Sequence, residues 1–222
     1  MFKNRKDAGE KLAKALEKYR SEKPVILAIP RGGVEVGLQV AAKLNTDFSL
    51  IIARKLPFPD NPEAGFGAIA ENGSTFMFEN AHYWLAGETI ERIKQQQTVE
   101  IERRVNALRG GRSLPEIAGK TVILIDDGIA MGSTMRAAIE LCKNRKAEKI
   151  VVAVPVAGRE VAEEIQKKVD ELIVLEIPAH FRAVAEAYER WYDVSDEEVL
   201  DLLREKIRKK EQKDHEIHGL ET

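Results

Sequence analysis

Two neighbouring carboxylates, Asp126 and Asp127, stand between a short apolar run and a turn of small residues. The apolar run, residues 122–125, is typical of a buried parallel strand, which would bring both acids to the carboxyl edge of a sheet. Open α/β sheets bind their ligands at that edge. Carboxylates repel phosphate but accept hydrogen bonds from the neighbouring hydroxyls of a sugar. The acid pair therefore predicts a site for ribose hydroxyls.

The turn after the acids has the composition of a phosphate-binding loop. Its glycines allow a tight turn, and its small residues let backbone N–H groups approach an anion. A helix expected from Ser133 adds the positive end of its dipole, and Thr134 adds a hydroxyl donor. The residues expected to hold a 5-phosphate are Gly128, Ala130, Met131, Gly132, Ser133 and Thr134. Acids and turn together predict a ribose 5-phosphate as the ligand.

Other nucleotide motifs fit this turn poorly. A P-loop needs a lysine immediately before its serine or threonine, and the dinucleotide fingerprint needs three glycines, and the turn has neither. The remaining alternative is an ordinary strand and helix joined by an acidic turn. That alternative requires the strand, the acid pair, the glycine spacing and the terminal threonine to coincide by chance.

The segment Val122 to Thr134 closely resembles the phosphoribosyl pyrophosphate (PRPP) signature of the type I phosphoribosyltransferases. By this resemblance, Asp126 and Asp127 would hold the ribose hydroxyls and Ala130 to Thr134 the 5-phosphate. It implies displacement of pyrophosphate from PRPP by a nucleobase-like acceptor. It also implies Mg²⁺ as cofactor, bridging diphosphate and ribose oxygens and held by the two acids only indirectly.

A second turn, Ile29-Pro30-Arg31-Gly32-Gly33, follows the first predicted strand. An arginine that can donate two parallel hydrogen bonds, followed by exposed N–H groups at a helix start, suits a diphosphate. In the 6-oxopurine members of the resembled family, an Arg-Gly-Gly turn here binds pyrophosphate, commonly after a cis peptide bond. The resemblance thus implies a cis Pro30–Arg31 bond, a pyrophosphate site at Arg31, Gly32 and Gly33, and a catalytic role for Arg31. In isolation, Arg31 would read as a surface arginine.

The resemblance also has a departure. Purine-salvage relatives often place an acid at the third loop position after the acid pair, where this chain has Ala130. Met131 also replaces a more usual threonine or alanine. No general base is therefore visible, and the acceptor stays open. The alternative is a non-catalytic regulatory protein that binds PRPP.

The elements that would position these residues alternate along the chain. Apolar runs predict strands at 25–29, 48–53, 121–126, 149–156 and 171–177. Amphipathic spacing and a capping box predict helices at 7–20, 34–44, 89–108, 133–144, 159–168 and from Ser195 onward. The alternation predicts an α/β fold, with a mostly parallel central sheet flanked by helices. One domain over residues 1–222 is expected, with its core at about 20–178.

Two further regions are expected around that core. The segment at about 54–80 is rich in proline and glycine and predicts a mobile loop or hairpin after the second strand, with one strand near 67–70. At its base, Arg54 is a candidate pyrophosphate contact and Lys55 a candidate catalytic cation; two solvated cations are the alternative. By the resemblance, residues 1–20 and 178–210 would form a small hood over the base, with Phe181 and Trp191 as candidate contacts. The alternative is that these aromatics pack in the hood core.

Composition limits the other classes of function. The chain has 222 residues with 35 basic and 37 acidic side chains, a balance that does not favour nucleic acid as a partner. Its basic run 204–213 is expected to be a solvated helix face, with an RNA-contacting tail as the alternative. No apolar run reaches membrane-spanning length, so a cytoplasmic protein without a membrane partner is expected, and a homodimer. The one cysteine, Cys142, is expected to pack in the core.

Overall fold

The computed structural model describes residues 1–218, with the side chains of residues 1–208 and Gln212. Its centre is a sheet of five parallel strands in the order β2-β1-β6-β7-β8. The strands are β1 (Val25–Ala28), β2 (Phe48–Leu50), β6 (Thr121–Ile125), β7 (Lys149–Val156) and β8 (Glu171–Glu176). The mostly parallel α/β fold expected from the sequence is confirmed.

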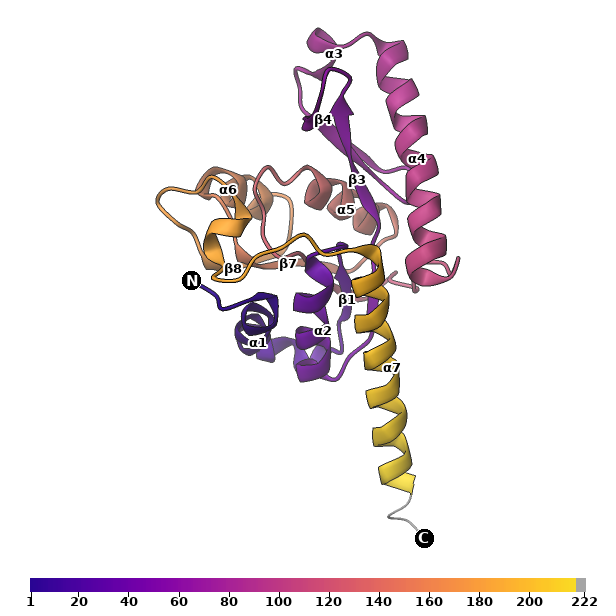
Figure 1. The fold of residues 1–222 in the computed structure, drawn as a ribbon, viewed down its shortest axis with the longest axis vertical. Helices are drawn as coiled ribbons and strands as arrows, with labels where there is room; N and C mark the ends of the chain where they lie inside the picture. The colour runs from indigo at the N-terminus through magenta and orange to yellow at the C-terminus, as the bar shows by residue number, and fades with distance from the viewer. Residues whose placement is uncertain (219–222) are drawn as a thin grey trace.

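Helices cover both faces of this sheet because the side chains of each strand point alternately to the two sides. Ile26, Ile123 and Val151 pack against α1 (Arg5–Ala15) and α2 (Gly33–Leu44). Their strand neighbours Leu27 and Val122 pack on the opposite side against α5 (Ser133–Asn144) and α6 (Arg159–Gln166). Figure 1 shows α1 and α2 below the sheet and α5 and α6 above it. A short 3₁₀ helix, η1 (Glu17–Glu22), continues the first helix.

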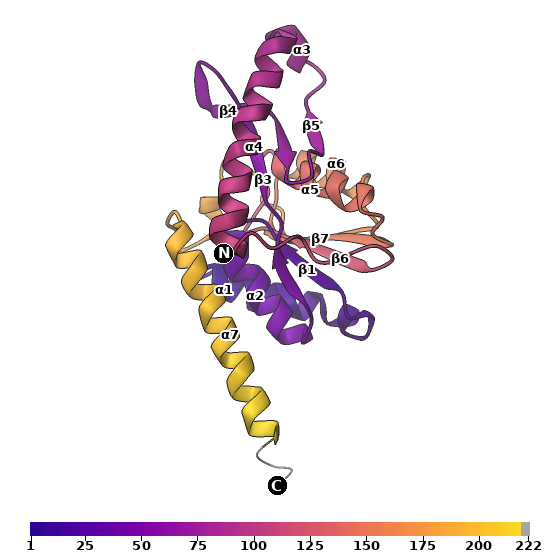
Figure 2. The same ribbon diagram turned by 90° about the vertical axis from the view of Figure 1, so that its right-hand side faces the viewer.

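The chain between β2 and β6 forms an arm that rises from the core (Figures 1 and 2). We use "arm" for residues 53–109. It contains the antiparallel strands β3 (Ala53–Phe58), β4 (Asn61–Ala70) and β5 (Thr75–Met77), then α3 (Ala81–Trp84) and α4 (Gly87–Arg109). Leu56 and Phe66 of the strands pack with Ile90 and Ile101 of α4.

The proline- and glycine-rich composition of the arm did not predict all of these strands. We expected one strand near 67–70, whereas the structure has three. Pro57 lies where the register between β3 and β4 shifts, so it marks a bulge. A side chain at Gly67 would place its Cβ 2.2 Å from the carbonyl oxygen of Phe76, so this glycine lets β5 approach β4. In this arm, Pro57 and Gly67 therefore belong to strands and not to a loop.

Arg109, at the end of α4, attaches the arm to the core. Its buried guanidinium donates to the carbonyl oxygen of Leu50 in β2 at 2.9 Å and forms an ion pair with Glu71, just after β4. Glu71 also accepts a hydrogen bond from the backbone N–H of Ile52 at 3.0 Å. These contacts fix the base of the arm beside the β2 edge of the sheet.

The first residues of the chain meet the segment that follows β8 beside the core. Phe2 forms a parallel bridge opposite Tyr188, through backbone hydrogen bonds with Ala187 and Glu189. It also packs against the Tyr188 ring, next to η2 (Val184–Ala187). The final helix, α7 (Asp196–His218), begins with the expected capping box, in which Ser195 and Glu198 exchange hydrogen bonds of 2.7 and 3.1 Å. It then extends away from the body (Figure 2). Within residues 1–218, no helix is both long and apolar enough to cross a membrane.

Candidate functional site

The two loops singled out in the sequence lie side by side. Strand β1, which precedes Arg31, pairs in parallel with β6, which precedes Asp126, and Ala28 is level with Ile125. The N–H of Ile29 donates to the carbonyl oxygen of Ile125 at 2.8 Å, extending the pairing beyond the strands. Both loops therefore leave the carboxyl edge of the sheet at neighbouring positions.

Glycine is required where the loops touch. A Cβ atom on Gly32 would lie 1.7 Å from Oδ2 of Asp127, and one on Gly33 would lie 2.9 Å from Cα of Asp126. The first distance is far inside van der Waals contact, so no other residue fits at position 32 without displacing the acid. The two glycines bring the Arg31 loop directly against the acid pair.

The Arg31 loop has the backbone that the resemblance implied. The peptide bond between Pro30 and Arg31 is cis, as predicted. Among the described residues, no backbone or side-chain acceptor pairs with the N–H groups of Arg31, Gly32 or Gly33, where α2 begins. The Arg31 side chain is 39% exposed, and its Nη1 lies 3.7 Å from Oδ1 of Asp196. This loop can offer N–H donors and a cation to an anion.

The acid pair is held in a largely buried position. The N–H of Asp127 donates to Oδ1 of Asp126 at 2.9 Å, and Nε of Arg5 donates to Oδ2 of Asp127 at 2.8 Å. Burial raises the pKa of Asp126 well above its ordinary value, and the charge of Asp127 raises it further. Burial also raises the pKa of Asp127, while Arg5 opposes that rise. A ligand that donates hydrogen bonds to these carboxylates would favour their ionised form.

The small-residue turn after the acids is anchored at both ends. The N–H of Ile129 donates to the carbonyl oxygen of Val156 at 2.9 Å, and Gly132 adopts a left-handed conformation with φ of 71°. Helix α5 starts at Ser133, as predicted. Among the described residues, nothing accepts a hydrogen bond from the N–H groups of residues 130–135. This turn therefore has the free donors of an anion site.

Arg136 supports that turn and was missed in the sequence. Its side chain is buried, donates from Nη1 to the carbonyl oxygen of Met131 at 2.6 Å, and forms an ion pair with Glu164. Its guanidinium also lies 4.9 Å from the ring centre of Phe76 in the arm. The only sequence signal was a charge on the first turn of a helix whose neighbours are apolar.

Arg5 is the second residue missed in the sequence, and it changes the interpretation of the hood. Its guanidinium lies 4.0 Å from the ring centre of Trp191 and donates to the carbonyl oxygen of Tyr192 at 3.0 Å. One face of Trp191 is therefore covered by an arginine. The Tyr188 hydroxyl donates to the carbonyl oxygen of Asp127 at 2.6 Å. The two terminal segments thus meet at the acid pair.

The other candidates fall in different places. Phe181 lies over Gly158, where a Cβ would come 3.2 Å from its ring. Arg54 donates to the side chain of Gln97 at 3.1 Å, and burial together with the charge of Arg104 lowers its pKa. Lys55 instead donates to the carbonyl oxygen of Glu63 at 2.5 Å, across the β3–β4 hairpin. Arg54 therefore lies near the arginines of α4, whereas Lys55 is engaged within the β3–β4 hairpin.

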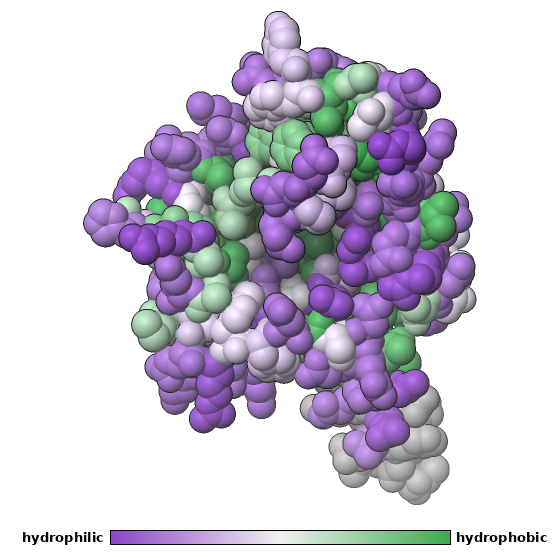
Figure 3. All heavy atoms as spheres, turned by 45° about the horizontal axis from the view of Figure 1, so that its top comes forward, coloured by the Kyte–Doolittle hydropathy of each residue, from purple (hydrophilic) through white to green (hydrophobic). Residues whose placement is uncertain are grey.

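The molecular surface is hollowed between the arm and the core, with hydrophilic residues along much of the rim (Figure 3). A separate groove of about 610 Å³ lies at the opposite edge of the sheet, between Glu22, Lys120 and Asp170. That groove is at the amino ends of the strands, where parallel sheets rarely bind ligands. The carboxyl edge is therefore the candidate site.

Metal binding by protein groups alone is not supported here. Among the described residues, no three histidine, cysteine or acidic side chains converge in a way that could hold an ion. Asp126 and Asp127 offer carboxylate oxygens, which suit Mg²⁺ when a phosphorylated ligand supplies the remaining oxygens. The donor set fits an ion that arrives with its substrate.

Comparison with known proteins agrees with this geometry. Residues 2–189 match the family described as "Phosphoribosyl transferase domain". Two Mycobacterium tuberculosis proteins, from strains CDC 1551 and H37Rv and both named "Putative phosphoribosyl transferase", are 34% identical over 205 residues. These matches cover 91% of this chain but 46% of each relative, so the chain spans about half of their length.

Among solved structures, the crystal structure of TT1426 from Thermus thermophilus is similar throughout. The TM-score is 0.79 at 35% identity, and the match covers 92% of this chain and 98% of that one. The family match, these relatives and the two adjoining loops at the carboxyl edge of the sheet lead to the same result: the chain belongs to the type I phosphoribosyltransferase family.

Proposed function

We propose that the protein is a PRPP-dependent, Mg²⁺-dependent transferase in which a nucleobase-like acceptor displaces pyrophosphate. The observation that carries this proposal is the contact between Gly32 and Asp127. It joins a loop suited to pyrophosphate to a loop suited to ribose 5-phosphate. PRPP carries a diphosphate and a 5-phosphate on one ribose, so one molecule can occupy both loops.

Each loop then has a distinct task. The free N–H groups of residues 130–135 and the start of α5 hold the 5-phosphate, while Asp126 and Asp127 accept hydrogen bonds from the ribose hydroxyls. Arg31 and the N–H groups of Gly32 and Gly33 hold the diphosphate. Held at both ends, the sugar presents its anomeric carbon in a fixed orientation.

The reaction is a substitution at the anomeric carbon. A lone pair of the acceptor forms the new bond, the carbon–oxygen bond to pyrophosphate breaks, and its electron pair leaves with the pyrophosphate. Arg31 stabilises the charge that develops on the leaving group. Mg²⁺ bound with the substrate would neutralise further charge on the same oxygens. The acceptor's proton passes to solvent, since position 130 is alanine and supplies no base.

The test is incubation with PRPP, Mg²⁺ and a panel of nucleobases while pyrophosphate release is followed. Acceptor-dependent release is the expected result. Asp126→Asn/Asp127→Asn should abolish it and weaken PRPP binding. Asp47→Asn/Asp201→Asn should not, because it neutralises two exposed acids, one just before the amino end of β2 and one on α7. Retained PRPP affinity in the first double variant would refute the assignment of the acids.

The absence of an acid at position 130 also supports a second candidate, a regulatory protein that binds PRPP without turnover. Tight PRPP binding in a calorimeter, together with no pyrophosphate release for any base in the panel, would favour that function. In the family relatives that match here, about half of each protein lies outside the matched region.

A further inference from the structure

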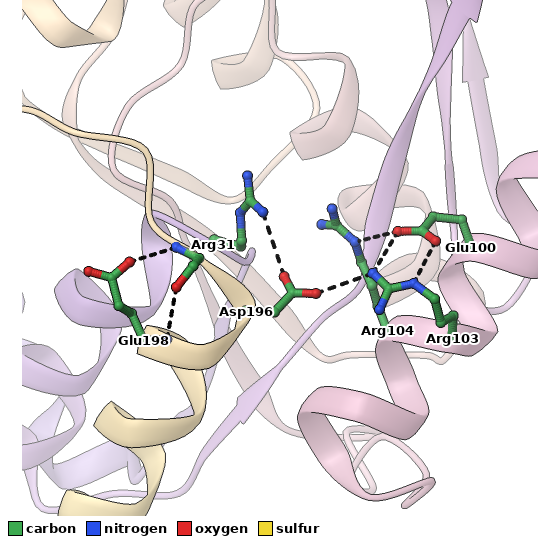
Figure 4. Close-up of polar contacts among 7 residues, drawn as sticks. Arg31, Glu100, Arg103, Arg104, Asp196 and Glu198 are labelled. Carbon is green, nitrogen blue, oxygen red and sulfur yellow. Dashed lines mark hydrogen bonds and ion pairs between the residues drawn. The ribbon is translucent and has the colours of Figure 1, made fainter.

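One carboxylate joins the Arg31 loop to the arm. Asp196, the first residue of α7, has Oδ1 3.7 Å from Nη1 of Arg31 and Oδ2 3.2 Å from Nη2 of Arg103 in α4 (Figure 4). Three segments distant in the sequence therefore meet at this side chain: the loop after β1, the arm and the start of α7.

The groups around Asp196 carry an excess of positive charge. On α4, Glu100 pairs with both Arg103 and Arg104, which lowers the pKa of this carboxyl to about 2 (Figure 4). Arg54 donates a hydrogen bond to the neutral side chain of Gln97, and it attracts the Glu100 carboxylate by charge without a direct ion pair among the described residues. With Arg31, the cluster contains four guanidinium groups and the two carboxylates of Glu100 and Asp196. Among these named residues the positive charges therefore outnumber the negative ones by two.

The arginines are close enough to repel one another. Burial is the main cause of the lowered pKa of Arg54, and the charges of Arg104, Arg103 and Arg31 lower it further. Helix α4 is held against the core through Arg109, so its arginines cannot separate from the core by a rigid movement of the helix. Holding like charges together in a partly buried place is costly unless an anion binds among them.

We propose that Arg54, Arg103 and Arg104 form the arm side of the pyrophosphate subsite whose core side is Arg31, and that Asp196 is an internal counter-ion that pyrophosphate displaces. The inference rests on the proposed function and deepens it. The leaving group is then held between the core and the arm, and its affinity is set by competition with a carboxylate of the same chain.

The contact between Asp196 and Arg31 has the properties of a displaceable pair. Its 3.7 Å separation is longer than a hydrogen bond, so it holds Arg31 by charge alone. Oδ1 of Asp196 is buried without any hydrogen-bond donor. Pyrophosphate has more charge and more acceptor oxygens than a carboxylate, so it can satisfy several guanidinium groups at once.

The decisive variant is Asp196→Asn, with Asp201→Asn as its matched control. Asp201 is exposed on the same helix and pairs with Arg204, so the control removes the same charge outside the cluster. Calorimetric titration with Mg²⁺ and inorganic pyrophosphate should show roughly three- to tenfold tighter binding for Asp196→Asn, the scale of removing one nearby charge. Binding by Asp201→Asn should equal that of the native protein. Unchanged or weaker binding by Asp196→Asn overturns the proposal.

The arm is tested by Arg104→Gln against Lys94→Gln. Lys94 lies on the same helix but pairs with Glu91 and borders a different groove. Arg104→Gln should weaken pyrophosphate binding about tenfold, Arg104→Lys should restore part of it, and Lys94→Gln should have no effect. Thermal unfolding of each variant separates loss of binding from loss of fold. Native-like binding by a folded Arg104→Gln overturns the role of the arm.

The inference and the proposed function can fail separately. If Asp126→Asn/Asp127→Asn loses PRPP binding while Asp196→Asn and Arg104→Gln bind pyrophosphate as the native protein does, this inference alone is wrong. If the native protein binds neither PRPP nor pyrophosphate, the proposed function is wrong and the inference with it.

Discussion

Arg5 donates a hydrogen bond of 2.8 Å from its Nε to Oδ2 of Asp127, across 122 residues of sequence. The arginine side chain is 4% exposed and the aspartate side chain 13%, so the pair is shielded from solvent. The same guanidinium lies over Trp191. Helix α1, the acid pair and the chain before α7 are thereby fixed to one another. The direction of the Asp127 carboxylate is set by a residue in the first turn of α1.

Replacing Arg5 with methionine should destabilise the protein and weaken PRPP binding. The change leaves the Asp127 carboxylate buried without its partner, which costs about 3 kcal/mol of unfolding free energy. It also removes the charge that opposes the raised pKa of Asp127, so PRPP affinity should fall most steeply in acid. Denaturant unfolding and calorimetry from pH 5 to 8 measure both effects. Lys6→Met, at the exposed neighbouring position, is the control; equal losses in both variants would contradict the role of the pair.

Gly32→Ala should disrupt the site with little effect elsewhere. The added Cβ would lie 1.7 Å from Oδ2 of Asp127, so the acid pair or the Arg31 loop must move. We expect at least a hundredfold loss of PRPP affinity and about 1 to 3 kcal/mol of destabilisation from overpacking. Gly87→Ala is the matched control because, apart from its chain neighbours and its own helix backbone, no atom lies within 4 Å of its added Cβ. A Gly32→Ala protein that binds PRPP normally would show that the two loops can separate freely.

Asp126→Asn should stabilise the protein at neutral pH in the absence of ligand. The folded-state pKa of Asp126 is raised above its unfolded value, so the native protein loses stability as the pH rises through that interval. The asparagine variant lacks this loss, which amounts to about 1.4 kcal/mol for each pKa unit. Its advantage should therefore shrink as the pH falls toward about 4, near the ordinary carboxyl pKa. Urea unfolding at pH 4, 5.5 and 7 measures the difference in unfolding free energy between the variant and the native protein. A native protein more stable than the variant at pH 7 would contradict the prediction.

Arg136→Gln should raise the Michaelis constant for PRPP while leaving the maximal rate nearly unchanged. Arg136 holds the carbonyl oxygen of Met131, and because the peptide is planar and trans, the N–H of Gly132 points the opposite way. Loss of that hold should weaken 5-phosphate binding by about 1 to 2 kcal/mol. Steady-state kinetics with varied PRPP, and thermal unfolding beside the exposed control Arg145→Gln, provide the readout. A fall in maximal rate alone would point to another role.

How far the sequence predicts this structure differs from element to element. Helix 133–144 and strand 149–156 have the expected bounds, because an uninterrupted apolar face or run sets them locally. The arm was underestimated because Pro57 and Gly67 have loop character unless the partner strand is known. Its sheet is held by cross-strand contacts that no local pattern encodes.

The candidate site divides in the same way. Its loops were predictable since each is a continuous segment, and the cis bond at Pro30–Arg31 was confirmed. Arg5 and Arg136 were not predictable, because their partners lie far away in the sequence or are backbone carbonyl groups. Trp191 was expected as a candidate surface for a base, but Arg5 covers one of its faces. The roles of all these residues in binding PRPP remain predictions.

The pairing of β1 with β6 has a consequence for folding as well as for chemistry. The two loops form one site only when these two strands are paired. A ligand bound to both loops therefore acts as a reversible cross-link between separate parts of the chain. Saturation with ligand should then slow amide hydrogen exchange in both strands at once, by the factor that mass action dictates. Substrate supply would in this way govern how often the central sheet opens.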